Sequence, residues 1–312
     1  MSQWPIPYLA ATAAKREHYV PKRLLEKFAV DGLLEVYEIR TGVKFATHTI
    51  NAAVGSRFYD LRVNGEDLSL EGWLADIEGL VCPILERLIE DPSALTTLSV
   101  QEREYIARFV AIQELRSPSQ RWTEAKMRSQ IVDHLREVGQ SWLRKELGKE
   151  DAEGVWEVWK DRPDEWFLNE SEPHQPSALT AGMADTTPGL GNVLQAMPWR
   201  IGRASGNCIY TSDSPVSRLP RSATRFTVYF DNVFFLPLAP NTLLRIGPGI
   251  TPDESRLDSV ADFNPWETSI ARHAVTQCAT RHLFGSGPFV SRECAETCLV
   301  KLGKTPMSKV AP

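Results

Sequence analysis

Hydrophobic residues alternate with polar ones near the start of the chain, after a short predicted helix. Leu33 to Ile39 has the two-residue period of a strand, and Arg40-Thr41-Gly42 supplies a turn with glycine where a positive φ is tolerated. Val43 to Thr49 is then the returning strand, and 56–61 is expected to form a third. These residues predict a β-rich start to the fold.

The period changes to three and four residues between 68 and 168, as expected for helices with one buried face. One helix is predicted over 74–88. Ser99 and Glu102 form a capping box that opens a second, which runs to about Arg116. A third is predicted over 122–147. Four aromatic residues follow and are expected to pack one end of the helical bundle: Trp156, Trp159, Trp166 and Phe167.

Strand patterns return after a loop over 169–192 that contains a short helix. The expected strands are 199–204, 207–211, 225–235 and 242–246. Asn264, Pro265 and Glu267 have the residue types of an N-cap, a first helical position and a third. A final helix is therefore predicted from Asn264 to about Phe284.

Strands at both ends with helices between them indicate an α+β fold. We expect one domain over 15–290, preceded by an arm at 1–14 and followed by a tail at 291–312. Its mixed or antiparallel sheet would combine N- and C-terminal strands around the helical region at 68–168. The alternative is a helical domain inserted between two small β units.

Composition narrows the class of protein. The chain has 312 residues and a formal net charge of -5, which argues against a surface coated with nucleic acid but allows a local basic cleft. No run of about 18 apolar residues is present, so no membrane partner is expected. The five cysteines are Cys82, Cys208, Cys278, Cys294 and Cys298. Their odd number and wide spread favour reduced thiols in a cytoplasm, with neither disulfides nor a four-ligand zinc site.

Gln113 and Arg116 place an amide and a guanidinium beside the buried face of the second helix, near its end. Such groups are costly to bury unless they are paired. They are candidates for substrate binding and catalysis, respectively. The alternative is an arginine that caps carbonyl groups at its own helix terminus.

Ser212, Asp213 and Ser214 follow an apolar strand and precede a proline. Side chains at a strand end commonly contact ligands. The serines are candidate substrate-binding groups or nucleophiles, and Asp213 is a candidate base, metal ligand or arginine partner. The alternative is a turn in which these residues bond local backbone N–H groups.

His18 lies ahead of the first predicted helix and is a candidate general acid or base, unless it has a structural hydrogen bond. Arginines form a second pattern, with Arg200, Arg203, Arg218, Arg221 and Arg225 against one acid, Asp213. Arg116 and Arg121 are expected to join them in space. Such a cluster could bind phosphate or a nucleic-acid backbone, with Arg218 the substrate-binding candidate. A solvated surface is the alternative.

Several of these segments together resemble the domain of unknown function 4238 family. The resemblance rests on His18-Tyr19-Val20-Pro21, Gln113-Glu114-Leu115-Arg116-Ser117-Pro118 and Tyr210-Thr211-Ser212-Asp213-Ser214-Pro215-Val216, with further matches at 36–42, 58–61 and 236–240. It covers about 18–284 and implies a bacterial-type cytoplasmic protein of one domain. It brings no established activity, but it implies that His18, Gln113, Arg116 and Asp213 matter together.

Three classes of function stay open. The first is an enzyme acting on a phosphodiester or nucleotide, such as a toxin or defence nuclease, with Arg116 holding a phosphate, His18 as acid or base and Asp213 orienting His18 or a metal. The second is a non-catalytic interaction protein in which the same residues stabilise the fold. The third is a nucleic-acid-binding module that uses the arginines of 200–225. The sequence contains no P-loop, dinucleotide fingerprint, zinc-protease motif or Gly-x-Ser-x-Gly elbow, and it specifies no cofactor.

Overall fold

The computed structural model describes residues 4–11, 16–56, 58–63, 66–163, 189–206, 208–220, 232–249 and 257–301. The helices are α1 (Lys22–Glu26), α2 (Glu71–Glu90), α3 (Val100–Leu115), α4 (Pro118–Leu147), α5 (Lys149–Trp159), α8 (Pro265–Cys278) and α9 (Arg292–Lys301). Two 3-10 helices, η1 (Thr49–Asn51) and η2 (Pro92–Thr97), add to these, and residues 189–196 are also helical.

The strands of the N-terminal half are β1 (Ala10–Ala11), β2 (Arg16–His18), β3 (Leu33–Glu38), β4 (Lys44–His48), β5 (Val54–Ser56), β6 (Asp60–Val63) and β7 (Glu66–Ser69). Those of the C-terminal half are β8 (Trp199–Arg203), β9 (Thr211–Ser212), β10 (Ser217–Pro220), β11 (Asn232–Ala239), β12 (Thr242–Ile246), β13 (Ser259–Val260) and β14 (His282–Phe284). Helices and strands together make the predicted single-domain α+β fold.

Four sheets organise these strands. The largest has the order β10-β11-β12-β8-β13, and the second has the order β4-β3-β14-β9. In the second sheet β14, from near the C-terminus, pairs antiparallel with N-terminal β3, with Leu283 opposite Tyr37. The prediction that one sheet combines both ends of the chain is therefore confirmed.

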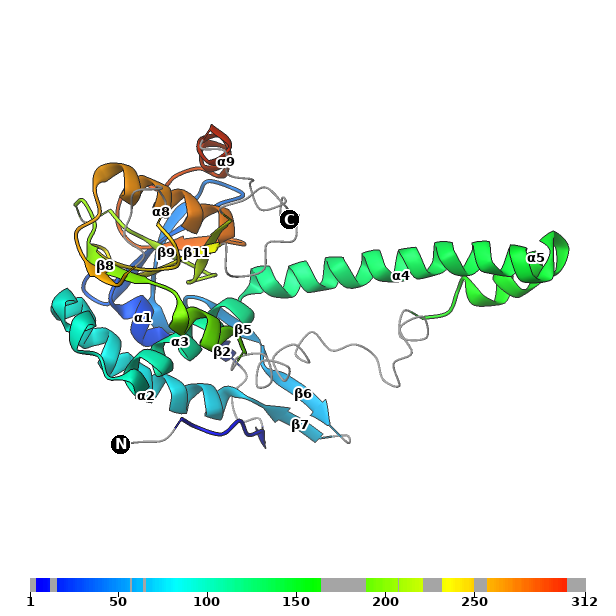
Figure 1. Ribbon diagram of the computed structural model, residues 1–312, viewed down its shortest axis with the longest axis horizontal. Coiled ribbons are helices and arrows are strands. Elements are labelled where there is room, and N and C mark those ends of the chain that lie inside the picture. Colours follow the sequence, from blue (N-terminus) through cyan, green and yellow to red (C-terminus); the bar gives the residue numbers. More distant parts are fainter. Residues whose placement is uncertain are drawn as a thin grey trace.

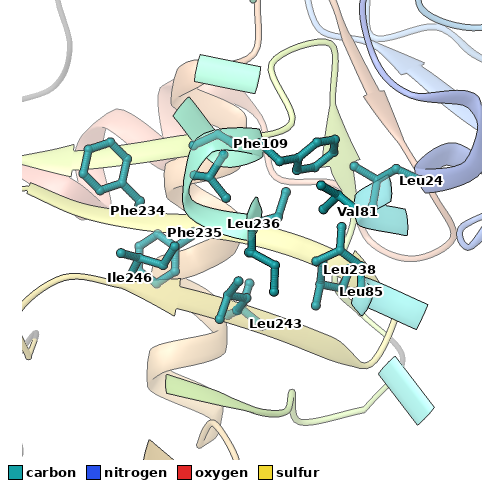
Figure 2. Packing of buried hydrophobic residues seen from close by; sticks show 14 of the residues in the cluster. Leu24, Val81, Leu85, Phe109, Phe234, Phe235, Leu236, Leu238, Leu243 and Ile246 are labelled. Carbon is teal, nitrogen blue, oxygen red and sulfur yellow. The ribbon is translucent and has the colours of Figure 1, made fainter. Parts of the chain in front are cut away.

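The core lies between the largest sheet and the helices α1, α2 and α3. All eight residues of β11 are buried, as expected for a strand covered on both faces. Figure 2 shows Val81 and Leu85 of α2 beside Leu238 of β11, with Phe109 of α3 and Leu24 of α1 completing the cluster. This packing fixes α2 and α3 against the sheet.

The helices α4 and α5 form an antiparallel hairpin that projects from the rest of the molecule (Figure 1). The third predicted helix thus begins at Pro118, earlier than expected. Trp156 and Trp159 lie on α5, which packs against α4, the third predicted helix, and not against α2 or α3. Trp166 and Phe167 lie outside the described residues. No described helix is long and apolar enough to cross a membrane.

Local capping signals predicted helix starts correctly. Ser99 and Glu102 form a reciprocal capping box at α3, and Asn264 and Glu267 form another at α8. The end of α8 was predicted wrongly, because this helix stops at Cys278 and β14 follows at His282–Phe284. Ala279 is extended, with ψ 137°, which ends the helical hydrogen-bond pattern.

Two strand predictions need correction. The expected third strand at 56–61 is two strands in different sheets, because β5 ends at Ser56 and β6 begins at Asp60. The strand expected over 207–211 is shorter: Cys208 to Tyr210 are not in a strand, and β9 covers Thr211–Ser212. Asn207 lies outside the described residues, as does 225–231 of the strand predicted before β11.

Candidate functional site

Arg116 is the C-cap of α3 and one of the most buried polar residues, with 1% of its surface exposed. Its Nε donates to Oε1 of Gln113 at 3.0 Å, and its Nη2 lies 2.9 Å from Oε1 of Glu78 on α2. A buried guanidinium needs such partners, because removing it from water is costly. The side chain therefore joins α3 to α2, and does not cap carbonyl groups at its own helix end.

Tyr59 connects Arg116 to His18. The guanidinium carbon of Arg116 lies 6.0 Å from the centre of the Tyr59 ring, and the Tyr59 hydroxyl donates to the His18 carbonyl at 3.2 Å. The backbone N–H of Tyr59 donates to Glu17 Oε2 at 2.6 Å, while Ser69 Oγ donates to the other Glu17 oxygen at 2.6 Å. These contacts hold together the end of β2, the end of β7 and helix α3.

The His18 ring is half-buried at the end of β2. Burial lowers the pKa of His18, whereas a hydrogen bond with the Thr49 carbonyl and the nearby Glu78 carboxylate oppose this shift. Nε2 of the ring is buried and has no hydrogen-bond partner among the described residues. A buried nitrogen of this kind is rare in folded proteins and often marks a place where a ligand or water binds.

Ala53 adds backbone strain beside His18. Its φ is 50°, in the left-handed region that side chains other than glycine seldom adopt, and the residue is buried. Its carbonyl accepts the N–H of Tyr19 at 3.0 Å, directly after His18. Strain of this type often occurs at functional sites, which supports a role for the loop from Thr49 to Ala53.

Glu71 and Glu78 belong to this cluster, although sequence reasoning did not select them. Burial raises the pKa of Glu71 to about 7, with Arg116 opposing the shift and Glu78 adding to it. Glu78 interacts electrostatically with His18 as well. The available signal was position: Glu78 lies four residues after buried Leu74 and three before buried Val81, so it interrupts the apolar stripe of α2.

Asp213 has a different environment. Its carboxylate accepts the backbone N–H groups of Thr280 at 2.8 Å, Arg281 at 2.6 Å and His282 at 3.1 Å. Burial raises the pKa of Asp213 to about 6, although these three donors favour the ionised form. The predicted roles of base, metal ligand or partner of Arg116 are not what its contacts show, because the carboxylate fixes the turn between α8 and β14.

Ser212 and Ser214 lie in the turn that the sequence offered as an alternative. Ser212 Oγ donates to the Ser214 carbonyl at 2.7 Å and accepts the Ser214 N–H at 3.1 Å. Both residues are buried. Their contacts are those of a serine turn before a proline, and a substrate-binding role stays a prediction.

Arg218 lies on β10 and approaches α3. Its Nη1 is 3.5 Å from Oε1 of Glu114, a buried carboxyl whose pKa is raised by burial. Because Glu114 and Arg116 are two residues apart, the last turn of α3 contacts the C-terminal sheet through one residue and α2 through the other. Arg218 is thus part of the buried framework beside the cluster.

The other described arginines of the predicted cluster also form ion pairs or hydrogen bonds within the fold. Arg200 Nη1 lies 2.6 Å from Glu267 Oε1, and Arg203 donates to Thr242 Oγ1 at 2.5 Å and to the Glu90 carbonyl at 3.1 Å. Arg221, Arg225 and the side chain of Arg121 lie outside the described part of the chain. The described arginines are thus paired or hydrogen-bonded within the fold, and binding of phosphate or nucleic acid by this cluster stays a prediction.

The structure thus brings the predicted residues together unequally. Gln113 and Arg116 are hydrogen-bonded to each other. His18 is connected to them through Tyr59, which contacts the Arg116 guanidinium and donates to the His18 carbonyl. Asp213 is close enough to Tyr19 to act on it: burial raises the pKa of Tyr19, and the Asp213 charge raises it further. We call His18, Glu71, Glu78 and Arg116 the acid–base cluster.

The structure also shows the state of the cysteines and which side chains could bind a metal ion. All five cysteines are free, and burial raises the pKa of Cys82 to about 12 and that of Cys278 to about 11, which makes these two thiols unreactive. Within the described ranges, no three His, Cys, Asp or Glu side chains are grouped so that they could hold a metal ion.

These features define an α+β protein in which one helix end joins a half-buried acid–base cluster to a C-terminal sheet. Residues 16–285 match the model of the family described as protein of unknown function DUF4238, and the chain belongs to that family. No curated protein and no solved structure matches the chain.

Proposed function

We propose that this protein is an enzyme that acts on a phosphodiester or nucleotide by general acid–base catalysis at the acid–base cluster. The observation that carries the proposal is the His18 ring, whose buried Nε2 has no partner among the described residues while Glu78, Thr49 and Tyr59 surround the residue. Nε2 of Gln113, whose oxygen accepts from Arg116, is a second buried atom without a hydrogen-bond partner among the described residues. Polar atoms of this kind are suited to receive groups from a substrate.

The two titrating groups suit complementary roles. His18, with a lowered pKa, is neutral near pH 7 and acts as the base that removes a proton from the attacking hydroxyl or water. Glu71, with a pKa of about 7, is still partly protonated and acts as the acid that protonates the leaving oxygen. Acid–base sites typically have neighbouring titratable groups whose environments shift their pKa values in opposite directions.

Arg116 has a positioning role in this proposal. It is already bonded to Glu78 and Gln113, so it holds the carboxylate that faces His18 and does not bind the phosphate itself. Arg16 and Lys22 are close enough to lower the pKa of His18 further. Their positive charges would attract an anionic substrate toward the ring.

We further propose that the protein is a cytoplasmic toxin or defence nuclease. Its free cysteines support this compartment, because thiols stay reduced in the cytoplasm. The test is hydrolysis of RNA, single-stranded DNA and nucleotides by purified protein, with and without Mg²⁺. His18→Ala and Glu71→Gln should each lower the rate by about 10²-fold or more, the usual size of one acid–base contribution.

The matched control is His282→Ala. His282 is also half-buried with a pKa lowered by burial, but it lies on β14 outside the cluster. This control should keep the wild-type rate. Equal loss in all three variants, or no hydrolysis of any substrate by the wild type, would count against the enzyme proposal.

A second candidate function, a non-catalytic interaction protein, is favoured by the projecting hairpin. Ile131, Val138 and Trp142 of α4 are 45%, 48% and 53% exposed and lie 7 and 4 residues apart, on one face. If this face is the functional surface, Val138→Glu with Trp142→Glu abolishes an effect of the protein on cell growth while His18→Ala leaves it unchanged. The reverse outcome supports the enzyme. We do not propose a nucleic-acid-binding module that uses the arginines of 200–225, because those that the structure describes form ion pairs or hydrogen bonds within the fold.

A further inference from the structure

The N-terminal arm, residues 4–11, has a sequence that favours a polyproline-II conformation. Pro5 and Pro7 fix φ near −65°, and each proline also biases the residue before it, Trp4 and Ile6, toward extended backbone. A Pro-x-Pro segment of this kind loses little conformational entropy when it binds. The arm therefore has the chemistry of a recognition peptide.

The arm lies on a surface built from α2 and α3, which we call the α2–α3 groove. The indole Nε1 of Trp73, a residue only 1% exposed, donates to the Pro5 carbonyl at 3.1 Å. The Trp4 ring lies 5.6 Å from the Tyr105 ring, and the Arg108 guanidinium lies 5.4 Å from the Trp4 ring. An indole N–H to a carbonyl beside aromatic rings is the way grooves bind proline-rich segments.

Space remains beside the bound arm. An open groove of about 400 Å³ is lined by residues 4–7 of the arm and by Gln101, Glu104, Tyr105 and Arg108 of α3. Arg108 pairs with Glu104, but its buried Nε has no hydrogen-bond partner among the described residues. The arm thus does not use every donor of the surface it occupies.

The rest of the arm is held by few contacts. Ile6 is 78% exposed, and Tyr8 contributes one exposed hydrogen bond, to Asp76 at 3.0 Å. Beyond it, Ala10 and Ala11 pair with β7. Because exposed bonds of this type contribute little net free energy, release of the arm is inexpensive compared with unfolding.

We propose that the α2–α3 groove is a docking site for a Pro-x-Pro segment, filled within one chain by its own arm and exchanged with the arm of a second copy. Every copy offers one arm and one groove, so two copies can exchange arms reciprocally in a closed, symmetric pair. All contacts in the exchanged pair are those already formed within one chain. This inference does not depend on the proposed enzymatic function.

The test uses full-length protein and a labelled peptide with the sequence of Ser2 to Ala11. The arm within the chain competes at a high effective concentration, so the peptide should bind the wild type weakly. It should bind Trp4→Ala at least about 10-fold more tightly, because that change weakens the competitor. Tyr8→Phe, which removes only the bond to Asp76, should give a smaller gain and decides the result if Trp4→Ala fails to fold.

Two controls define the binding mode. A peptide with both prolines replaced by alanine should bind less tightly, and Trp73→Phe combined with Trp4→Ala should lose about 10-fold in affinity for the normal peptide, since the indole donor is gone. Equal affinity of the normal peptide for wild type, Trp4→Ala and Tyr8→Phe overturns the docking site.

The second copy is tested by cross-linking between chains. Ile6→Cys and Gln101→Cys place one new thiol on the arm and one on the groove lining. When the two variants are mixed under mild oxidation, disulfide-linked pairs of chains should form, because the arm of one copy lies in the groove of the other. Each variant mixed with wild type is the control for the natural free cysteines. A mixture of the two variants with no more linked pairs than these controls overturns a second copy as the occupant, whatever the peptide result.

Discussion

Asp213 is buried and His18 is half-buried, both at strand ends, and they differ in how completely the fold satisfies their hydrogen-bonding groups. The Asp213 carboxylate receives three backbone N–H groups, from Thr280, Arg281 and His282. The His18 ring keeps a buried nitrogen without a partner among the described residues. A fully bonded group indicates a structural role, whereas a group with unused capacity indicates a place for a ligand. Similar positions in the sequence therefore carry different functions.

Arg116→Ala should have the largest effect on the free energy of unfolding and tests the acid–base cluster beside His18. We expect about 3 kcal/mol of destabilisation, the low end for breaking a buried ion pair, because Glu78 keeps 24% of its side chain exposed. Glu78→Gln in the same chain should recover part of the loss, measured by chemical denaturation in a double-mutant cycle. Arg87→Ala, which breaks an exposed pair with Glu102, is the control and should change stability by less than about 1 kcal/mol.

Asp213→Asn tests the structural side. An amide offers one acceptor oxygen to three donors and turns its own N–H₂ toward them, so we expect about 2 kcal/mol of destabilisation. Hydrolysis by the folded fraction should be unchanged, and thermal melting beside a rate assay measures both. Loss of hydrolysis with unchanged melting would instead place Asp213 at the reacting centre.

Glu71→Gln tests the acid–base cluster beside His18 through the pH dependence of stability. Because the pKa of Glu71 rises from 4.5 to about 7 on folding, the native state binds the proton more tightly, and wild-type stability falls as pH rises between these values. The variant should be more stable than wild type by about 1 kcal/mol at pH 8, after allowance for partial solvent screening, with no gain below pH 4.5. A gain that is the same at every pH would show that ionisation of Glu71 is not its cause.

Ala53→Gly should have the smallest effect. Glycine relieves the left-handed strain of about 1–2 kcal/mol but loses more entropy on folding, so we expect a net stabilisation of about 0.5–1 kcal/mol. Asp31→Gly is the matched control, since Asp31 is exposed with φ 51°. Asp tolerates this region better than Ala, so its gain should be smaller, and a destabilised Ala53→Gly would argue against strain beside His18.

Much of the fold could be predicted because its signals are local. The capping boxes at Ser99 and Asn264 fixed two helix starts, and β12 has the predicted bounds of Thr242–Ile246. Strand β14 was missed because it is only three residues long and directly follows a strongly periodic helix. Its conformation depends on pairing with β3, more than 240 residues away, as in Leu283 opposite Tyr37.

The candidate site divides in the same way. Gln113 and Arg116 could be selected because polar residues interrupt a buried helical face. Glu78 follows the same rule but had no neighbouring motif to draw attention to it. The partners of Asp213 could not be predicted at all, since they are backbone N–H groups of Thr280 to His282, and these have no signature in the side chains.

The projecting hairpin is joined to the body within two residues of Arg116, and this connection has a mechanical consequence. Helix α4 has 30 residues and is therefore about 45 Å long, which makes it a lever arm (Figure 1). Its fulcrum is Ser117, whose hydroxyl is bonded to the Glu114 carbonyl at 2.9 Å. A force applied to the exposed face of α4 at Trp142 would therefore act through Ser117 on the end of α3, where the Arg116 guanidinium is bonded to Glu78.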